Sequence, residues 1–181
     1  LSATSITPGA TLNWYTTPTE GSIVGTGSPF TTPVISATTN YYVQASAGIF
    51  TGSVGPASPT AQGGTIGTQS VNWDVFFDVL QSTTLLSVDI FPNTSGVSSS
   101  LLIRNSSGTL LGTIPYTTTV SGGKTAQTIP INLALPSGTD YYIEGAMPSG
   151  GLQRNTTGAT YPYNSSVIKI TGNGFLNSYY M

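Results

Sequence analysis

The sequence predicts an all-β protein, and three observations indicate this class. Only 6% of the 181 residues are charged, and the chain carries 30 Thr, 23 Ser and 10 Tyr in their place. Such a composition lacks the usual helix formers and favours strands. The 22 Gly and 12 Pro fall between short apolar segments and mark turns. Within those segments apolar residues recur at a spacing of two, and no segment has the 3.6-residue period of a helix.

Residues 1–46 are predicted to form a small β domain with two strands. The first covers residues 10–16, where Leu12 and Trp14 lie on one face, and the second covers residues 40–45. The segment between these two strands is rich in glycine and proline, so we expect turns there.

A connector and a larger β domain are predicted to follow. Residues 47–69 are rich in Gly, Pro and Ser, which indicates a connector with one short strand near 48–53. In residues 70–181 the alternation becomes stronger. Strands are expected at 71–79, 85–91, 100–104, 110–115, 128–135, 141–147, 167–171 and 175–181. Short strands at this spacing are typical of an antiparallel sandwich such as a jelly roll.

The alternation also predicts which side chains face the core. Apolar residues occupy the odd positions of 71–79, and Leu86, Val88 and Ile90 are expected to point inward in the next strand. Pro130 lies within a predicted strand, and proline has no N–H to donate to a neighbour. We therefore expect that strand at the edge of a sheet.

The missing residue types exclude several classes of function. With no His and no Cys, the chain cannot form a Ser-His-Asp or Cys-His catalytic site, a thiol redox centre, or an ordinary zinc, haem or iron–sulfur site. Four Lys and Arg residues are too few for a nucleic-acid-binding surface. No apolar run reaches the ~18 residues of a membrane span. We expect no enzyme, and any signal peptide would precede residue 1.

The first domain resembles a known family. Residues 12–45 read LNWYTTPTEGSIVGTGSPFTTPVISATTNYYVQA, and this sequence is similar to immunoglobulin-like (Ig-like) repeats of large secreted proteins from Bacteroidota. The resemblance implies a small sandwich whose central tryptophan is Trp14. It also implies that the copy is incomplete, with a first strand before Leu1.

The second domain is similar to a sandwich module found beside such repeats. The matching segments include VNWDVFFDV, LLSVDIFP and, at residues 154–163, RNTTGATYPY. Together the two resemblances imply a fragment of a multidomain protein that the type IX route exports to the cell surface or medium. Its partners would include the neighbouring domains of the same polypeptide. Such modules accompany gliding-type adhesins and secreted hydrolases, and the resemblance does not choose between them.

One segment combines a planar cation, an amide and two rings. Arg154, Asn155, Tyr161 and Tyr163 form a mixture suited to sugar or peptide recognition, because rings cover apolar faces while polar groups bind hydroxyls. In the alternative interpretation, Asn155 and Gly158 set the geometry of a turn and the tyrosines plug the end of the sandwich. We favour the alternative, since a loop requires such residues in any case.

A structural calcium ion is a second hypothesis, and no other cofactor is expected. If 71–79 and 85–91 paired as a hairpin, Asp89 would lie diagonal to Asp74 and Asp78, at roughly 7–8 Å. Calcium takes about six to eight oxygens, so loops would have to supply the rest. As a catalytic pair, Asp74 and Asp78 would lie about 13 Å apart along the strand, beyond the ~5–9.5 Å of glycosidase carboxylates. We favour the alternative, in which these three carboxylates belong to a solvated polar face.

The sequence thus favours a non-catalytic pair of modules in an exported, cell-surface protein that acts in adhesion or display. The Ig-like domain would be a spacer, and the sandwich either a second spacer or a ligand-binding head. The alternative is a carbohydrate-binding module that holds a secreted hydrolase near polysaccharide. Surface glycans or polysaccharides would be the external partners.

Overall fold

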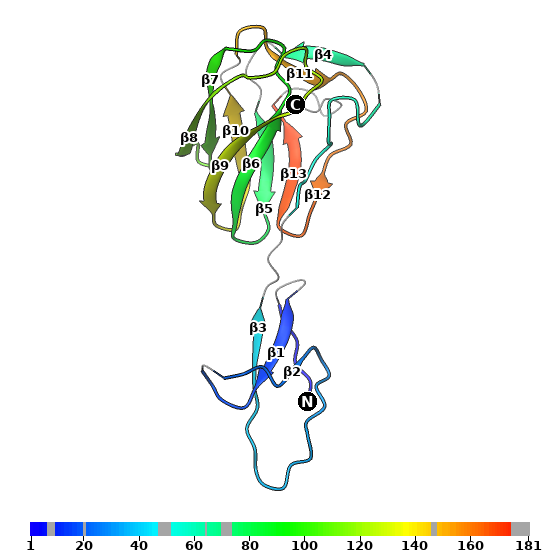
Figure 1. Cartoon of the computed structure of the whole chain (residues 1–181), viewed down its shortest axis with the longest axis vertical. Coiled ribbons are helices and arrows are strands. Elements are labelled where there is room, and N and C mark those ends of the chain that lie inside the picture. The colour runs from blue at the N-terminus through cyan, green and yellow to red at the C-terminus, as the bar shows by residue number, and fades with distance from the viewer. Residues whose placement is uncertain are drawn as a thin grey trace. The chain divides into compact units, whose positions relative to one another are not determined.

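A computed structural model describes residues 1–6, 10–19, 21–46, 52–63, 65–69, 74–145 and 148–174. The chain divides into two compact units, Leu1–Thr51 and Gly52–Met181, each described by itself here (Figure 1). The described residues contain no helix, and their strands pair antiparallel in every sheet. The all-β prediction is confirmed.

The first unit contains a three-stranded sheet in the order β2-β1-β3. Its strands are β1 (Thr11–Tyr15), β2 (Gly25–Thr26) and β3 (Tyr42–Ser46). β1 and β3 confirm the two predicted strands. β2 was not predicted because two residues are too few to show an alternation.

Trp14 forms the centre of this unit, as the sequence predicted. Its side chain is 4% exposed and stacks on Phe30 with ring centroids 5.2 Å apart. Trp14 Nε1 donates a hydrogen bond of 2.8 Å to the carbonyl oxygen of Gly27. Tyr41 meets the other side of this cluster, edge to face with Phe30 at 5.5 Å. Aromatic packing therefore holds a unit whose sheet has only three short strands.

The described residues of the second unit form ten strands. They are β4 (Ile66–Gln69), β5 (Val75–Val79), β6 (Thr83–Ile90), β7 (Ser98–Arg104), β8 (Leu110–Thr117), β9 (Gln127–Leu135), β10 (Gly138–Gly145), β11 (Leu152–Asn155), β12 (Tyr163–Asn164) and β13 (Ile168–Asn173). Six of them form a sheet in the order β12-β13-β5-β10-β7-β8, while β6 pairs with β9 and β11 with β4.

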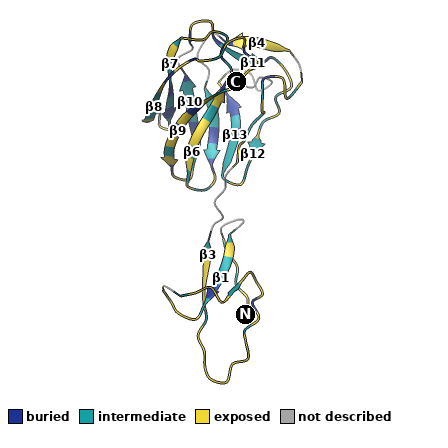
Figure 2. Ribbon diagram, viewed as in Figure 1, coloured by how far each residue is buried: buried dark blue, intermediate teal, exposed yellow. Residues whose placement is uncertain are grey.

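The β6–β9 pair covers one face of the six-stranded sheet (Figure 1). One hydrophobic cluster joins the two layers, with Phe77 and Ile103 from the large sheet and Leu135 from β9, all at most 3% exposed. A second cluster around Ile90 and Leu101 continues this core. Figure 2 shows that buried positions concentrate in the large sheet. The predicted sandwich is confirmed.

One inward-facing prediction is wrong. Leu86 is 56% exposed, because the register between β6 and β9 shifts between Leu85 and Ser87. Between the pairs on either side of this shift β9 has two residues, Ile131 and Asn132, where β6 has only Leu86, so the extra residue of the bulge lies in β9. Leu85 therefore packs against the core on one side of the bulge, and Val88 does so on the other.

The predictions for β4, for Pro130 and for three further ranges have different outcomes. Residues 66–69, placed in the connector by the sequence, form β4 and pair with β11, a strand that was not predicted. Within the described residues β9 pairs with β6 alone, which confirms the edge position of Pro130. Residues 71–73 and the strand at 175–181 lie outside the described residues, as does most of the strand near 48–53.

Candidate functional site

The predicted ligand loop connects β11 to β12, the edge strand of the six-stranded sheet. Arg154 and Asn155 are the last residues of β11 and pair with Gly67 and Ile66 of β4. Tyr163 begins β12 and pairs with Ile170. The segment is thus anchored by strand pairing at both ends.

Asn155 has a mainly internal role in the turn that follows β11. It is 1% exposed, and its side-chain Nδ2 donates a hydrogen bond of 2.8 Å to the carbonyl oxygen of Thr157. Gly158 has a φ of +87°, and a Cβ there would lie 2.6 Å from the carbonyl oxygen of Gln62. These two residues set the geometry of the turn.

The two tyrosines pack together and against the core. Their ring centroids are 5.1 Å apart at an interplanar angle of 70°, and both contact the main hydrophobic cluster. The Tyr161 hydroxyl accepts a hydrogen bond of 3.3 Å from Asn173 Nδ2. The Tyr163 hydroxyl accepts one of 3.0 Å from the backbone N–H of Thr160. Burial, with a smaller contribution from Tyr163 and opposed by the Asn173 hydrogen bond, raises the pKa of Tyr161 to about 12.

Arg154 lies along β4. Its Nη1 donates a hydrogen bond of 2.9 Å to the carbonyl oxygen of Asn155, and a Cβ at Gly67 would lie 3.6 Å from the same nitrogen. The four predicted residues therefore direct several of their polar groups toward the protein itself. These contacts favour the structural interpretation, and ligand binding at this loop stays a prediction.

The strand pairing behind the calcium hypothesis is wrong. β5 pairs with β10 and β13, and β6 pairs with β9. The chain leaves the large sheet after Val79 and enters the other layer, so Asp89 does not share a sheet with Asp78. The Asp89 Oδ1 instead accepts a hydrogen bond of 2.6 Å from Thr128 Oγ1. Among the described residues no three acidic side chains group as a metal site would require.

Sequence reasoning missed the ion pairs of the second unit. Arg104 Nε donates to Glu144 Oε2 at 2.9 Å, and Lys169 Nζ lies 3.7 Å from Asp78 Oδ2. The backbone N–H of Asp140 also donates to Asp78 Oδ1, at 3.1 Å. Partners up to about ninety residues apart in sequence meet only after the strands pair, so no local pattern could have revealed them.

Burial also affects Asp74, the third calcium candidate. The pKa of its carboxyl is raised, mainly because burial removes the carboxylate from water. The negative charge of Glu144 raises this pKa further, and the positive charge of Arg104 lowers it. The backbone carbonyl oxygen of Asp74 accepts a hydrogen bond of 2.8 Å from the N–H of Gly174.

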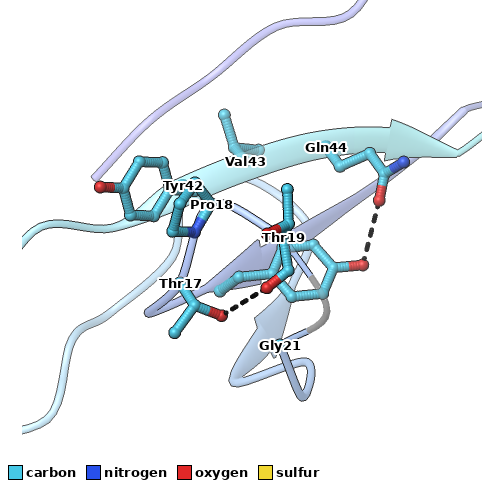
Figure 3. Close-up of a pocket in the computed structure, with 8 residues that line it drawn as sticks. Thr17, Pro18, Thr19, Gly21, Tyr42, Val43 and Gln44 are labelled. Carbon is cyan, nitrogen blue, oxygen red and sulfur yellow. Dashed lines mark hydrogen bonds between the residues drawn. The ribbon is translucent and has the colours of Figure 1, made fainter.

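A groove of about 570 Å³ lies on the first unit. The sequence predicted only a spacer role for this unit. The lining of the groove comes from β1, the loop after it and β3, as Figure 3 shows: Tyr15, Thr17, Pro18, Thr19, Gly21, Tyr42, Val43 and Gln44. The Tyr15 hydroxyl donates a hydrogen bond of 3.3 Å to Gln44 Oε1. Thr17 Oγ1 donates one of 3.2 Å to the carbonyl oxygen of Thr19. The available signal was the alternation in β1 and β3, which places these tyrosines on the face opposite Trp14.

The described part of the chain contains no helix with the length and apolar character needed to span a bilayer. No curated protein and no solved structure gives a match to the chain. Residues 1–50 match the family model described as Ig-like domain CHU_C associated. This match supports the Ig-like interpretation of the first unit and fits a non-catalytic module of a secreted or surface protein. The first unit is thus similar to this Ig-like family.

Proposed function

We propose that the chain is a non-catalytic pair of modules from an exported protein and acts in adhesion or display at the cell surface. The observation that carries the proposal is the succession of two β units. Residues 1–50 match an Ig-like family, and a separate β-sandwich unit follows from Gly52. Serial β units of this kind are suited to extend a polypeptide away from a cell while exposing loops to partners.

The chemistry of the acidic residues supports a non-catalytic role. Glu144 and Asp78 are held in ion pairs with Arg104 and Lys169, and Asp89 accepts a hydrogen bond from Thr128. A general acid or base must be within reach of a substrate proton and have a pKa near the working pH. The contacts of these carboxylates are instead with the protein, and the sequence offers no His or Cys to replace them.

Two measurements test export and adhesion separately. Antibodies raised against the 181-residue chain should label intact cells that produce it, and labelling only after permeabilisation would contradict export. Purified chain, added as a competitor, should reduce attachment of those cells to polysaccharide-coated glass. Unchanged attachment at saturating competitor would contradict adhesion and leave display alone.

A carbohydrate-binding module that targets a secreted hydrolase is the second candidate. The observation in its favour is the set of rings and neutral hydrogen-bonding groups at the loop of Arg154 and Tyr161. A glycan array probed with the chain and with Arg154→Ala and Tyr161→Phe variants tests it. Binding that both variants retain would show that this loop is not the site.

A further inference from the structure

We propose that the Ig-like unit itself binds a neutral oligosaccharide in the groove between β3 and the loop after β1. Tyr42 and Tyr15 would contact the sugar rings, and Gln44 would bind their hydroxyls. This site is distinct from the loop of Arg154 and Tyr161. It also goes beyond the proposed function, in which the Ig-like unit is only a spacer.

The register of the sheet places the three side chains together. Tyr15 lies directly opposite Tyr42, and Asn13 lies opposite Gln44. Residues directly opposite each other in an antiparallel pair share a face, and Tyr42 and Gln44 share that face because they are two residues apart. The hydrogen bond from the Tyr15 hydroxyl to Gln44 Oε1 confirms this arrangement and holds the amide at the groove.

These groups remain accessible in the unit. Tyr42 is 38% exposed, Gln44 is exposed, and Tyr15 is half-buried. Figure 2 shows that β3 is exposed along most of its length. Gln44 Oε1 accepts the hydrogen bond from Tyr15, and the two N–H donors of Gln44 Nε2 can serve a ligand at the same time.

The groove has the size of a small-ligand site. Its volume of about 570 Å³ falls within the range of roughly 300–1,000 Å³ found for ligand pockets. Gly21 lets the Thr17 side chain lie close against the loop: a Cβ at this position would collide with Thr17 Oγ1 and lie 3.6 Å from Tyr15 Cδ1. Thr17 and Thr19 add hydroxyl groups along the loop.

The charge of this unit selects a neutral ligand. All eight lining residues are uncharged. Glu20 is the one charged side chain in the sequence of residues 1–51, and its negative charge disfavours phosphates, sulfates and acidic sugars. Rings together with an amide and hydroxyls, without a cation, match the apolar faces and hydroxyl edges of neutral pyranoses.

Calorimetric titration of the full chain with cellohexaose, xylohexaose and mannohexaose tests the inference, with tetragalacturonic acid as the anionic comparison. At least one neutral hexaose should bind, and the anionic sugar should not. Tyr42→Ala should weaken binding by about tenfold or more. Gly21→Ala should also weaken it, because the added methyl group collides with Thr17 and displaces this lining side chain.

Ile23→Ala is the matched control, since Ile23 is 54% exposed in the same unit and does not line the groove. It should leave binding unchanged, and circular-dichroism spectra that match the spectrum of the unmodified chain should show that all three variants are folded. The inference is overturned if no neutral hexaose binds, or if Tyr42→Ala and Gly21→Ala both bind as well as the unmodified chain. Binding lost only in Arg154→Ala would place the site on the sandwich, which contradicts this inference but not the proposed function.

Discussion

The side-chain amide of Asn173 donates a hydrogen bond to the phenol oxygen of Tyr161, 3.3 Å away. Asn173 is itself 8% exposed, so this bond joins β13 to the loop that precedes β12 inside the second unit. The contact helps to hold the Tyr161 ring against the main hydrophobic cluster.

Tyr161 should titrate late and lower the stability at alkaline pH. Burial raises its pKa to about 12 from the ordinary value of 10.0. The folded state therefore holds the proton more tightly, and the stability that this proton contributes is lost as the pH rises from 10 towards 12. Ultraviolet titration should show a phenol with a pKa near 12, and Tyr161→Phe should remove this transition. The same variant should lose less stability between pH 10 and 12 than the unmodified chain, and an equal loss would contradict this account.

The bulge between β6 and β9 predicts unequal effects for two adjacent leucines of β6. Leu85→Ala should lower the free energy of unfolding by about 1–2 kcal/mol, because it removes a side chain packed on the core. Leu86→Ala should change it by less than about 0.5 kcal/mol, since Leu86 is 56% exposed. Urea denaturation of both variants measures the difference, and the reverse order would show that the register of β6 is different.

Gly158 should tolerate alanine less well than Gly96. Both have a positive φ, +87° and +78°, but a Cβ at Gly96 would meet no atom within 4 Å. Gly96→Ala should therefore cost only the left-handed backbone penalty of about 1–2 kcal/mol. Gly158→Ala adds a collision with the carbonyl oxygen of Gln62 and should cost at least about 1 kcal/mol more. Equal costs in urea denaturation would mean that the turn after Asn155 does not pack on Gln62.

Asp74 should make the folded state less stable as the pH rises through the acidic range. Its pKa is raised in the folded state above 3.8, chiefly by burial, so the folded state binds the proton more tightly than the unfolded state does. The stability due to that proton is complete below pH 3.8 and is lost as the pH rises through the raised value. Asp74→Asn should raise the melting temperature at pH 7 and flatten its decline from pH 4. Asp89→Asn, on an exposed position of β6, is the control for removing one negative charge.

Calcium should not stabilise the chain, since the hairpin that would have joined Asp89 to Asp74 and Asp78 does not form. A tightly bound ion stabilises the folded state by mass action. The melting temperature in excess EDTA and in excess calcium should therefore agree within about 1 °C. A clear rise with calcium would restore the hypothesis with ligands other than this set.

Local patterns predicted the strands that carry a strong alternation. β9 alternates through Ile129 and Ile131, and both are buried. β2, β4, β11 and β12 have two to four residues, too few for a period to emerge. Leu86 was predicted on the wrong face for a different reason. A bulge arises from the pairing of two strands, and the sequence of either strand alone does not reveal it.

The candidate sites also differ in whether their residues are close together or far apart in the sequence. Asn155 with Gly158, and Tyr161 with Tyr163, lie close in sequence, so a turn and an aromatic plug could be named from the sequence as an alternative to a ligand site. The groove between Tyr15 and Tyr42 joins residues 27 positions apart, and the Arg104–Glu144 pair joins residues 40 apart. Such juxtapositions depend on which strands become neighbours.

The sequence by itself determined the all-β class and the absence of His- and Cys-based chemistry, because composition and a period of two are local properties, and the resemblance to Ig-like repeats implied the central position of Trp14. The tertiary structure decided that β5 and β6 lie in different layers, that Leu85 rather than Leu86 faces the core, and that the Ig-like unit carries a groove. These outcomes depend on strand pairing between distant segments, where the burial of whole faces outweighs the preference of any single residue.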